Sequence, residues 1–571
     1  MAISLFAKIF PRKSKFPKLN TLHSTYRLAS VSIPAQTDKD YPDMDEDFFR
    51  FTRGRFVCNE TEQLIQRHVK FNVNELAATA AKAIGATKCV KIEKCPDGHY
   101  NKAFILTMDN GKEAIGKIPN PNAGPAHLTT ASEVATMDFM RNVLQTPVPQ
   151  VYTWNSRVNG DNRVGAEYII MERASGVPLG SVWDSLEPPD KLKVFLQIFK
   201  YQKRWTELKF SQFGSLYYSK DIATKSLSGN YLYIDGDGQP IKDSNFTVGP
   251  TVSREWLQDG RKDLQCYKGP WSSFLDYRMA IGRREGLAIR TLKQFPRQCV
   301  MLYGPGAYHP TSEKKLAAVE LYSQLLRHIL PSEAGLNSGH LWHDDLHSEN
   351  IFVNPDKPTE ITGIIDWQSA QITPLIDHCL DPSFLGYEGP DVGEDPQPPT
   401  LREDIDSLER DERIAAIKRF YDTSVMVAWR MLVKGKNPNQ HAAIRFRKSK
   451  AGHMLGLSQN LYVFGDAHFR ALVLDLRDEW VKLGKEFPIK FSAEEISEIE
   501  ADVKAADIGL GVMNMINERM GDLRSEKGFI EHENYEMGME MLRDIKRELM
   551  ERVVHSPEDK EAFDMFWPFD C

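Results

Sequence analysis

The segment Leu341–Val353, LWHDDLHSENIFV, places two histidines, three acids and an asparagine between apolar runs. A second segment follows at Ile361–Ala370, ITGIIDWQSA, in which an apolar run ends at an aspartate. Together they read His-x-Asp-Leu-x-x-x-Asn from His343 to Asn350, and then Ile-Ile-Asp ending at Asp366. Phosphoryl transfer from a magnesium nucleotide uses these residue types in this order, so the two segments predict that chemistry.

Each polar residue of this pattern has its own predicted role. Asp345 is a carboxylate on a loop and is expected to accept the proton of an attacking hydroxyl and to orient it. Asn350 and Asp366 are expected to bind Mg²⁺, because this ion prefers hard oxygen ligands in an octahedral arrangement. Residues 351–365 are typical of a strand, a Pro/Asp turn and a second strand. This hairpin would bring Asn350 and Asp366 together.

Single residues of the pattern also have simpler interpretations. His343 is either part of the catalytic pattern or a hydrogen-bonded histidine of the core, and Asp366 could cap a turn. We interpret His347 as a supporting residue, with proton transfer as the lesser alternative, because Asp345 already supplies a base. Asp344 would recruit a second cation or weaken nucleotide binding if it faced the phosphates, and it could equally face solvent.

Upstream, the sequence predicts a block of one helix, three strands, a second helix and two strands. The first helix should begin at an Asn74 cap and stop at Gly85. Alternating runs between turn signals predict an antiparallel sheet. The strands are expected at 88–95, 101–108, 113–118, 148–154 and 165–172, and the second helix at 132–144. Beyond residue 176 the pattern becomes mainly helical, and a capping box of Ser492 and Glu495 indicates a late helix.

The strings HDDLHSENIFV and IIDW resemble the catalytic and metal-binding motifs of the aminoglycoside phosphotransferase and choline kinase family. The resemblance implies an α+β, protein-kinase-like fold of two lobes, with a small antiparallel-sheet N-lobe and a larger, mainly helical C-lobe. The strings FTRGRFVCNE, KFNVNEL and YIIMERASGVPLGSVW resemble more closely a fungal mitochondrial branch of that family.

The resemblance also implies an ATP site in the N-lobe. Lys117 would contact the phosphates and Glu133 would position it. The alternatives are a lysine that keeps a strand edge soluble and a first-turn acid favoured by the helix dipole.

Two further parts of the ATP site follow from the same resemblance. Residues 95–104 would cover the phosphates, with Gly98 allowing close backbone approach and Asn101 donating a hydrogen bond, although this loop has one glycine and not three. Glu172 and Ala174 would lie in the hinge between the lobes, where backbone groups pair with adenine. The alternative for this hinge is a plain core strand.

Composition limits the class of protein. The chain has 571 residues, 41% of them hydrophobic and 26% charged, which is typical of globular proteins with two or three lobes. Seven cysteines without a C-x-x-C pair argue against a disulfide framework and a structural zinc site. No apolar run approaches the roughly 20 residues of a transmembrane helix. The net charge of −7 disfavours nucleic-acid binding, which normally needs a basic face. The oligomeric state is left open.

The N-terminus differs in charge from the remainder of the chain. Residues 1–37 contain six basic side chains and no acid, mixed with Ser, Thr and apolar residues. This composition predicts a mitochondrial transit peptide, with the mature protein in the matrix or at the inner membrane; a disordered basic tail is the alternative. Residues 38–49 carry six acids and suggest a solvated linker. The predicted division is a transit peptide (1–37), an acidic linker and N-terminal extension (38–72), an N-lobe (73–175), a C-lobe (176–390) and a C-terminal helical extension (391–571).

The acceptor site is expected between about residues 185 and 335, on the family's pattern. Arginines beside aromatic residues there could recognise an anionic or planar molecule, and the alternative is that they form core and surface. The residues concerned are Trp205, Tyr217, Tyr218, Arg254, Trp256, Arg261, Trp271, Tyr277, Arg283 and Arg284.

Two classes of function remain. The first is a phosphotransferase that uses ATP and Mg²⁺ to phosphorylate a hydroxyl of an unidentified small molecule. The second is a non-catalytic kinase-fold protein that binds nucleotide or acts as a scaffold in mitochondria. A protein kinase is a weaker third interpretation, because no A-P-E-like string follows Asp366 and no glycine-rich loop precedes it.

Overall fold

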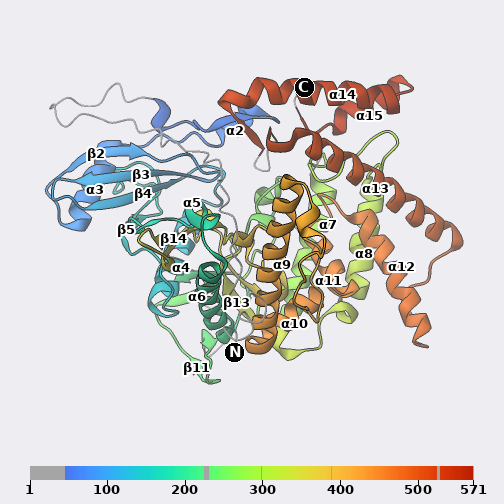
Figure 1. Cartoon of the computed structure of the whole chain (residues 1–571), viewed down its shortest axis with the longest axis horizontal. Coiled ribbons are helices and arrows are strands. Elements are labelled where there is room, and N and C mark those ends of the chain that lie inside the picture. The colour runs from blue at the N-terminus through green and yellow to red at the C-terminus, as the bar shows by residue number, and fades with distance from the viewer. Residues whose placement is uncertain are drawn as a thin grey trace.

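A small lobe built on an antiparallel sheet lies beside a larger and mainly helical lobe (Figure 1). The computed structural model describes residues 46–569, apart from 224–230, 293, 298, 388 and 524–527. The predicted transit peptide, residues 1–37, lies outside the described residues. The arrangement confirms the predicted two-lobed α+β class.

The sheet of the small lobe has five strands in the order β2-β3-β4-β6-β5, and each neighbouring pair is antiparallel. Alternation of buried and half-buried residues along β3 explains its formation, because only one of its faces packs on a core. Each predicted strand is present. Their bounds are β2 Cys89–Lys94, β3 Asn101–Met108, β4 Glu113–Pro119, β5 Val151–Asn155 and β6 Tyr168–Glu172.

Two helices accompany this sheet, and both begin earlier than predicted. Helix α3 (Val73–Ile84) is capped by Asn72, whose side chain accepts the backbone N–H of Glu75, and the prediction of Asn74 as the cap is wrong. Asn72 has the extended backbone that a cap needs, whereas Asn74 already lies inside the helix. Gly85 ends α3 with a φ of 70°, as predicted. Helix α4 (Leu128–Asn142) starts before the predicted residue 132.

The large lobe combines helices with short strands. Its first helices are α5 Gly180–Trp183, α6 Pro188–Glu207, α7 Phe274–Thr291 and α8 Ser312–Ile329. Its sheets have the orders β11-β10-β8-β13-β16, β15-β14-β7 and β12-β9. The strands are β7 Val177–Pro178, β8 Lys209–Phe210, β9 Ser215–Tyr218, β10 Tyr233–Ile234, β11 Pro240–Ile241, β12 Phe246–Gly249, β13 Gly339–Trp342, β14 Ile351–Asn354, β15 Lys357–Ile364 and β16 Gln371–Pro374.

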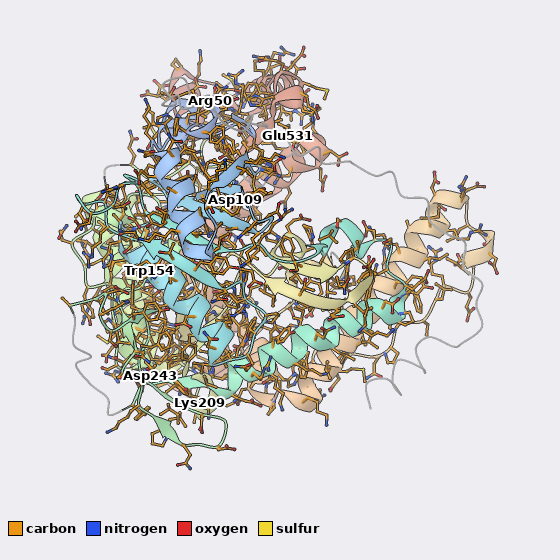
Figure 2. The ribbon with its side chains drawn as sticks, turned by 90° about the vertical axis from the view of Figure 1, so that its left-hand side faces the viewer. Arg50, Asp109, Trp154, Lys209, Asp243 and Glu531 are labelled. Carbon is orange, nitrogen blue, oxygen red and sulfur yellow. The ribbon has the colours of Figure 1, made fainter. Side chains whose placement is uncertain are left out.

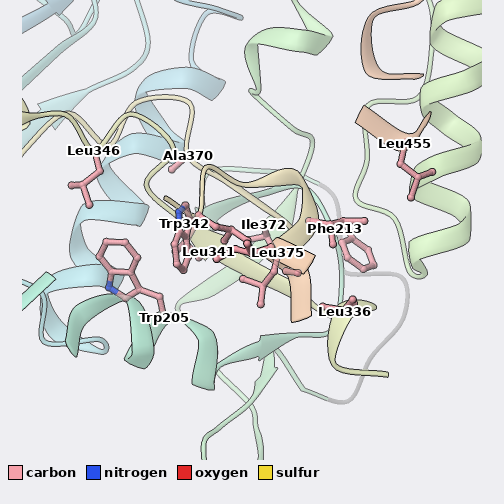
Figure 3. Packing of buried hydrophobic residues seen from close by; sticks show 14 of the residues in the cluster. Trp205, Phe213, Leu336, Leu341, Trp342, Leu346, Ala370, Ile372, Leu375 and Leu455 are labelled. Atoms are coloured by element: carbon pink, nitrogen blue, oxygen red, sulfur yellow. The ribbon is translucent and has the colours of Figure 1, made fainter. Parts of the chain in front are cut away.

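The first motif segment begins on β13, a strand whose four residues are all buried. Strand β13 pairs with β16, and Figure 3 shows Leu341, Trp342, Ile372 and Leu375 gathered beside one another. The ring of Trp205, from α6, meets that of Trp342 edge-on at a centroid distance of 5.3 Å. The loop that follows β13 therefore rests on a rigid apolar base.

Four of the helices after residue 390 share this core. They are α9 Arg410–Lys436, α10 Pro438–Arg447, α11 Lys450–Leu457 and α12 Asp466–Lys482. Trp429 of α9 is fully buried and packs edge-on against Phe195 of α6 at 4.9 Å, and one apolar cluster contains Trp429, Ile351 and Phe469. The predicted boundary at residue 390 is therefore not a boundary of the core. No helix of the described residues is long and apolar enough to cross a membrane.

The two ends of the described chain meet beside the small lobe. Strand β1 (Gly54–Phe56) pairs with β17 (Phe529–Glu531), and Arg50 and Glu531 lie near the same end of the molecule in Figure 2. The neighbouring elements are α2 Glu60–Ile65, α13 Ala493–Met520, α14 Tyr535–Val553 and α15 Pro557–Phe566. Helix α13 starts with the predicted capping box.

The acidic segment was predicted to be a solvated linker, and its final residues are instead folded. Phe48 is 1% exposed and stacks on Phe104 of β3 with ring centroids 5.5 Å apart. The end of the segment folds although the segment is acidic, because the burial of its aromatic side chains against the sheet is favourable.

We predict that Trp429→Ala lowers the free energy of unfolding of the whole large lobe by about 3–5 kcal/mol, because it leaves a cavity in the shared core. Urea unfolding followed by fluorescence and circular dichroism measures this change. Leu483→Ala is the control, since this side chain is 69% exposed and should change the free energy by less than about 0.5 kcal/mol. If helices α9 to α12 unfolded in a separate transition and only that transition lost stability, a shared core would be contradicted.

Candidate active site

Lys117 of β4 contacts two carboxylates from distant parts of the chain. Its Nζ lies 2.5 Å from Oε1 of Glu133 on α4 and 2.8 Å from Oδ1 of Asp366, which follows β15. The side chains of Lys117 and Glu133 are buried, whereas that of Asp366 is 33% exposed. This ion triad joins the sheet of the small lobe to the motif segments of the large one.

Burial and the contacts within the triad shift the pKa values of its three side chains. Burial would lower the pKa of Lys117, but Asp366 and Glu133 outweigh it and raise this pKa. Burial raises the pKa of Glu133, with a further contribution from the charge of Asp366. Burial would also raise the pKa of Asp366, but the ammonium of Lys117 lowers it below its usual value. An ammonium and an ionised carboxylate therefore stand side by side.

The predicted hairpin is present and brings Asn350 beside Asp366 along the backbone. Ile351 of β14 pairs with Ile364 of β15, and the N–H of Ile365 donates to the carbonyl of Asn350 over 2.9 Å. Asp366 has a φ of 61°, a left-handed conformation that Asp tolerates better than most residues. The hairpin thus ends in a sharp turn at Asp366.

Asn350 is held by the loop that carries Asp345. Its Nδ2 donates to the backbone carbonyl of Asp345 over 2.9 Å, so its carboxamide oxygen is the atom suited to a cation. The Asp345 side chain is 54% exposed, and its Oδ1 lies 3.8 Å from Nε2 of His347. Nδ1 of His347 accepts the N–H of Glu349, which places the ring proton on Nε2. This geometry agrees with a supporting role for His347.

His343 is buried and bonded within the site. Its Nε2 donates to the carbonyl of Ile365 over 2.8 Å, and its ring packs edge-on against Trp367 at 4.6 Å. Burial lowers its pKa, so the ring is neutral near pH 7. His343 therefore links the loop of Asp345 to the end of β15, next to Asp366.

Asp344 pairs with His378, although its side chain is 35% exposed and lines the same cavity as Asp366. Its carboxylate oxygens lie 3.1 and 3.0 Å from Nδ1 of His378, and the N–H of Cys379 donates to Oδ1 over 2.9 Å. Nε2 of His378 faces the carbonyls of His340 and Thr373. Because acceptors face both ring nitrogens, the protonated imidazolium satisfies all of them.

The pKa values agree with an ion pair between these side chains. Burial would lower the pKa of His378, but Asp344 outweighs it and raises this pKa. Burial would raise the pKa of Asp344, but His378 lowers it. Burial and the charge of His378 lower the pKa of the neighbouring His340 to about 3, so His340 stays neutral.

The remaining residues predicted for the nucleotide site lie around the small lobe. Asn101 exchanges two side-chain hydrogen bonds with Gln368, at 3.1 and 2.9 Å, and so links β3 to the turn after Asp366. The N–H of Gly98 donates to the carbonyl of Asn101, and an added Cβ at Gly98 would make only an ordinary contact. The backbone there does not itself require glycine.

Glu172 and Ala174, predicted for the hinge, line a cavity of about 470 Å³ beside Arg141 and Thr362. The N–H of Glu172 already donates to the carbonyl of Gln150. Neither Glu172 nor Ala174 lines the cavity of Asp345 and Asp366. Their role in binding adenine stays a prediction.

Asp345 and Asp366 line one cavity of about 340 Å³. Arg254 lines it too, and its guanidinium lies 4.0 Å from the ring centroid of Tyr100, in the loop predicted to cover the phosphates. Arg254 also contributes to the lowered pKa of Asp366. The described residues contain no group of three His, Cys, Asp or Glu side chains able to hold a metal ion.

Most of the aromatic and basic residues considered for the acceptor site belong to the core, which is one of the two interpretations that the sequence allowed. Arg261 and Arg284 are almost fully buried and both bind Glu285, because a buried guanidinium needs a carboxylate partner. Arg254 is an exception, since it lines the cavity. The other buried members are Trp205, Tyr217, Trp256, Trp271 and Tyr277.

The sequence analysis assigned no role to three residues that the structure brings to the site. They are Gln368, His378 and Arg447, and all three line the cavity of Asp345. Gln368 could have been singled out, because it stands two places after Asp366. His378 and Arg447 have no such signal, since their partners lie far along the chain.

Comparison with known proteins finds a matching family and several relatives. A model of the phosphotransferase enzyme family matches residues 91–376. A subtelomeric hrmA-associated cluster protein of Aspergillus fumigatus is 30% identical over 511 residues, which are 81% of this chain and 94% of the relative. Altered inheritance of mitochondria protein 9 of Saccharomyces cerevisiae is 26% identical over 475 residues, which are 76% of this chain and 71% of the relative. The resemblance found in the motifs is thus confirmed, with the kinase-like fold that it implies.

Solved structures show more distant similarity. An aminoglycoside phosphotransferase in a ternary complex with ADP and hygromycin B is 14% identical, with a TM-score of 0.34, and the match covers 75% of this chain and 98% of the other. A putative fructosamine-3-kinase from Thermobifida fusca is 15% identical with a TM-score of 0.31, over 72% of this chain and 100% of the other.

We predict that Asp344→Asn destabilises the fold in a pH-dependent way. The raised pKa of His378 contributes stability that is complete below roughly pH 6.5 and is lost as the pH rises through the folded-state pKa. The lowered pKa of Asp344 contributes stability that is complete above roughly pH 4 and is lost at more acidic pH. The free-energy difference from wild type should therefore be largest between roughly pH 4 and 6.5.

Urea unfolding at a series of pH values measures this difference. Asp184→Asn is the control, because Asp184 is exposed. A destabilisation by Asp344→Asn that stays constant from pH 5 to pH 9 would argue against the ion pair.

Proposed function

Because the chain belongs to the phosphotransferase enzyme family, we propose that it transfers a phosphoryl group from ATP, with Mg²⁺, to a hydroxyl of a small molecule. The observation that carries this proposal is the contact of Lys117 with both Glu133 and Asp366. This contact holds Lys117, which would bind phosphates, from the small lobe next to Asp366, which would bind the metal ion, from the large lobe.

The nucleotide end of the site would use Lys117, Asp366 and Asn350. Lys117 would bind phosphate oxygens while Glu133 holds its ammonium in place. The carboxylate of Asp366 and the carboxamide oxygen of Asn350 suit Mg²⁺, which is commonly bound by one or two protein ligands together with substrate phosphates and water. When bound, this ion would neutralise charge on the transferred group.

The loop predicted to cover the phosphates would complete the nucleotide end. Asn101 would close this loop over the nucleotide through its bonds to Gln368. Gly98 lies at its tip, and Glu172 and Ala174 would provide the hinge.

The acceptor end would use Asp345 as the base. Its exposed carboxylate shares a cavity with Asp366, and it would orient the hydroxyl and take its proton. His343 would act as a positioning residue, because it bonds the carbonyl next to Asp366. The charge of Asp344 does not argue for the non-catalytic alternative, because it is paired with His378.

The decisive experiment measures ADP release during a screen of metabolite extracts with labelled ATP. Asp345→Asn should lower turnover of the acceptor found by roughly 10²–10⁴-fold and leave ATP binding intact. Asp366→Asn should weaken Mg²⁺-dependent ATP binding, seen as a smaller thermal shift. Asp356→Asn is the matched control, because this exposed aspartate lies in the turn of the same hairpin. Full turnover in Asp345→Asn would refute the base assignment, and ATP binding without turnover would favour the scaffold.

We also propose that the protein is mitochondrial, in the matrix or at the inner membrane. The composition of residues 1–37 supports this location, and so does the word mitochondrial in the name of the yeast relative. Residues 1–37 fused to a fluorescent protein should direct it to mitochondria, whereas a fusion in which the six basic residues are replaced by Gln should stay cytosolic. A diffuse cytosolic signal from the unaltered fusion would contradict the proposal.

A further inference from the structure

A second cavity, of about 860 Å³, adjoins the proposed active site. Cys379 and Arg447 line both this cavity and that of Asp345. Most of its lining comes from α10, α11 and α12, beyond residue 376, where the match to the family model ends. The second cavity is therefore built largely by the C-terminal helices of this chain. Its volume suits a small-molecule ligand.

Basic side chains outnumber acidic ones in this lining. The arginines and the lysine are Arg430, Arg447 and Lys448, and the acids are Asp381 and Asp475. Arg430 pairs with Asp381 at 2.7 Å and Lys448 with Asp391 at 2.5 Å, so part of the charge is already balanced.

Arg447 differs from these two basic residues in its partners. It is exposed at the end of α10, and its Nη1 donates to the backbone carbonyl of His378 over 2.6 Å. Among the described residues, no carboxylate forms an ion pair with it. A guanidinium has five N–H donors in a planar fork, so Arg447 retains donors for a carboxylate or phosphate group.

The two cavities differ in charge, and this difference would orient a ligand. Asp345 places a carboxylate at the acceptor end of the first cavity, and this carboxylate repels an anionic group of the acceptor. Arg447 stands where the cavities meet and attracts it. A molecule with a hydroxyl at one end and an acid at the other would therefore place its hydroxyl toward Asp345.

We propose that the second cavity binds the acceptor and that this acceptor carries a carboxylate or phosphate group, which Arg447 holds. The proposal rests on the proposed function, because it assigns the acceptor class of the same site. It also disfavours polycations such as aminoglycosides, whose ammonium groups would lie beside the guanidinium of Arg447.

The test uses the full chain and matched pairs of compounds. Hydroxylated carboxylates and phosphate esters, such as gluconate and glycerol 3-phosphate, are compared with their neutral counterparts glucose and glycerol, with kanamycin as the polycation and inorganic phosphate as the minimal anion. Calorimetry measures binding, and ADP release with ATP and Mg²⁺ measures turnover. The variants are Arg447→Ala, Arg447→Lys and the control Arg445→Ala, since Arg445 lies on the same helix and pairs with Glu333 outside this cavity.

We expect anionic compounds to bind more tightly than their neutral counterparts. Arg447→Ala should weaken this binding about ten- to a hundredfold, Arg447→Lys less, and Arg445→Ala not at all. The proposal is overturned if neutral compounds or kanamycin bind as well as the anions, if no anion binds, or if Arg447→Ala behaves as Arg445→Ala does.

The two readouts separate the two proposals. Binding of anions that depends on Arg447 without any ADP release would support the anion site and argue against the phosphotransferase. Turnover of neutral acceptors that Arg447→Ala leaves unchanged would support the phosphotransferase and argue against the anion site.

Discussion

Lys117 places one ammonium between carboxylates that the two lobes contribute separately, and the geometry of the site depends on this contact. Such a buried ion pair adds little net stability, because removing the charges from water costs about as much as their attraction returns. The ion pair matters because it fixes the positions of its side chains. Glu133 fixes the ammonium from the small lobe, and Asp366 meets it from the large lobe. Loss of either partner would leave a charge uncompensated in a poorly solvated place.

The apolar base beneath the motif segments gives this contact its precision. Trp205 and Trp367 pack against each other, and the indole N–H of Trp367 donates to the carbonyl of Ile364. Asp366 follows strand β15, which this packing holds in place. Its backbone therefore keeps a left-handed conformation that a looser environment would allow to relax. Helices α9 to α12 belong to the same cluster, so they support the site although they lie outside the family match.

Local signals in the sequence were enough for much of this arrangement. Alternation and turn residues predict the sheet from β2 to β6, and the motif spacing predicts the hairpin that ends at Asp366. Features that depend on distant partners could not be predicted in the same way. Asp344 is the clearest case, because its charge is read correctly from the sequence while its partner, His378, becomes a neighbour only through the pairing of β13 with β16. Likewise Phe48 belongs to an acidic segment and is buried only because β3 offers it Phe104.

The pairing of β1 with β17 has a consequence for how the chain assembles. Gly54 lies opposite Glu531, so the ladder between them cannot close until residues 54–531 have all left the ribosome, or a translocation channel. Until then β1 exposes unpaired backbone groups, and a chaperone or a neighbouring nascent chain can bind them. A truncation that removes β17 would therefore leave the edge of β1 open.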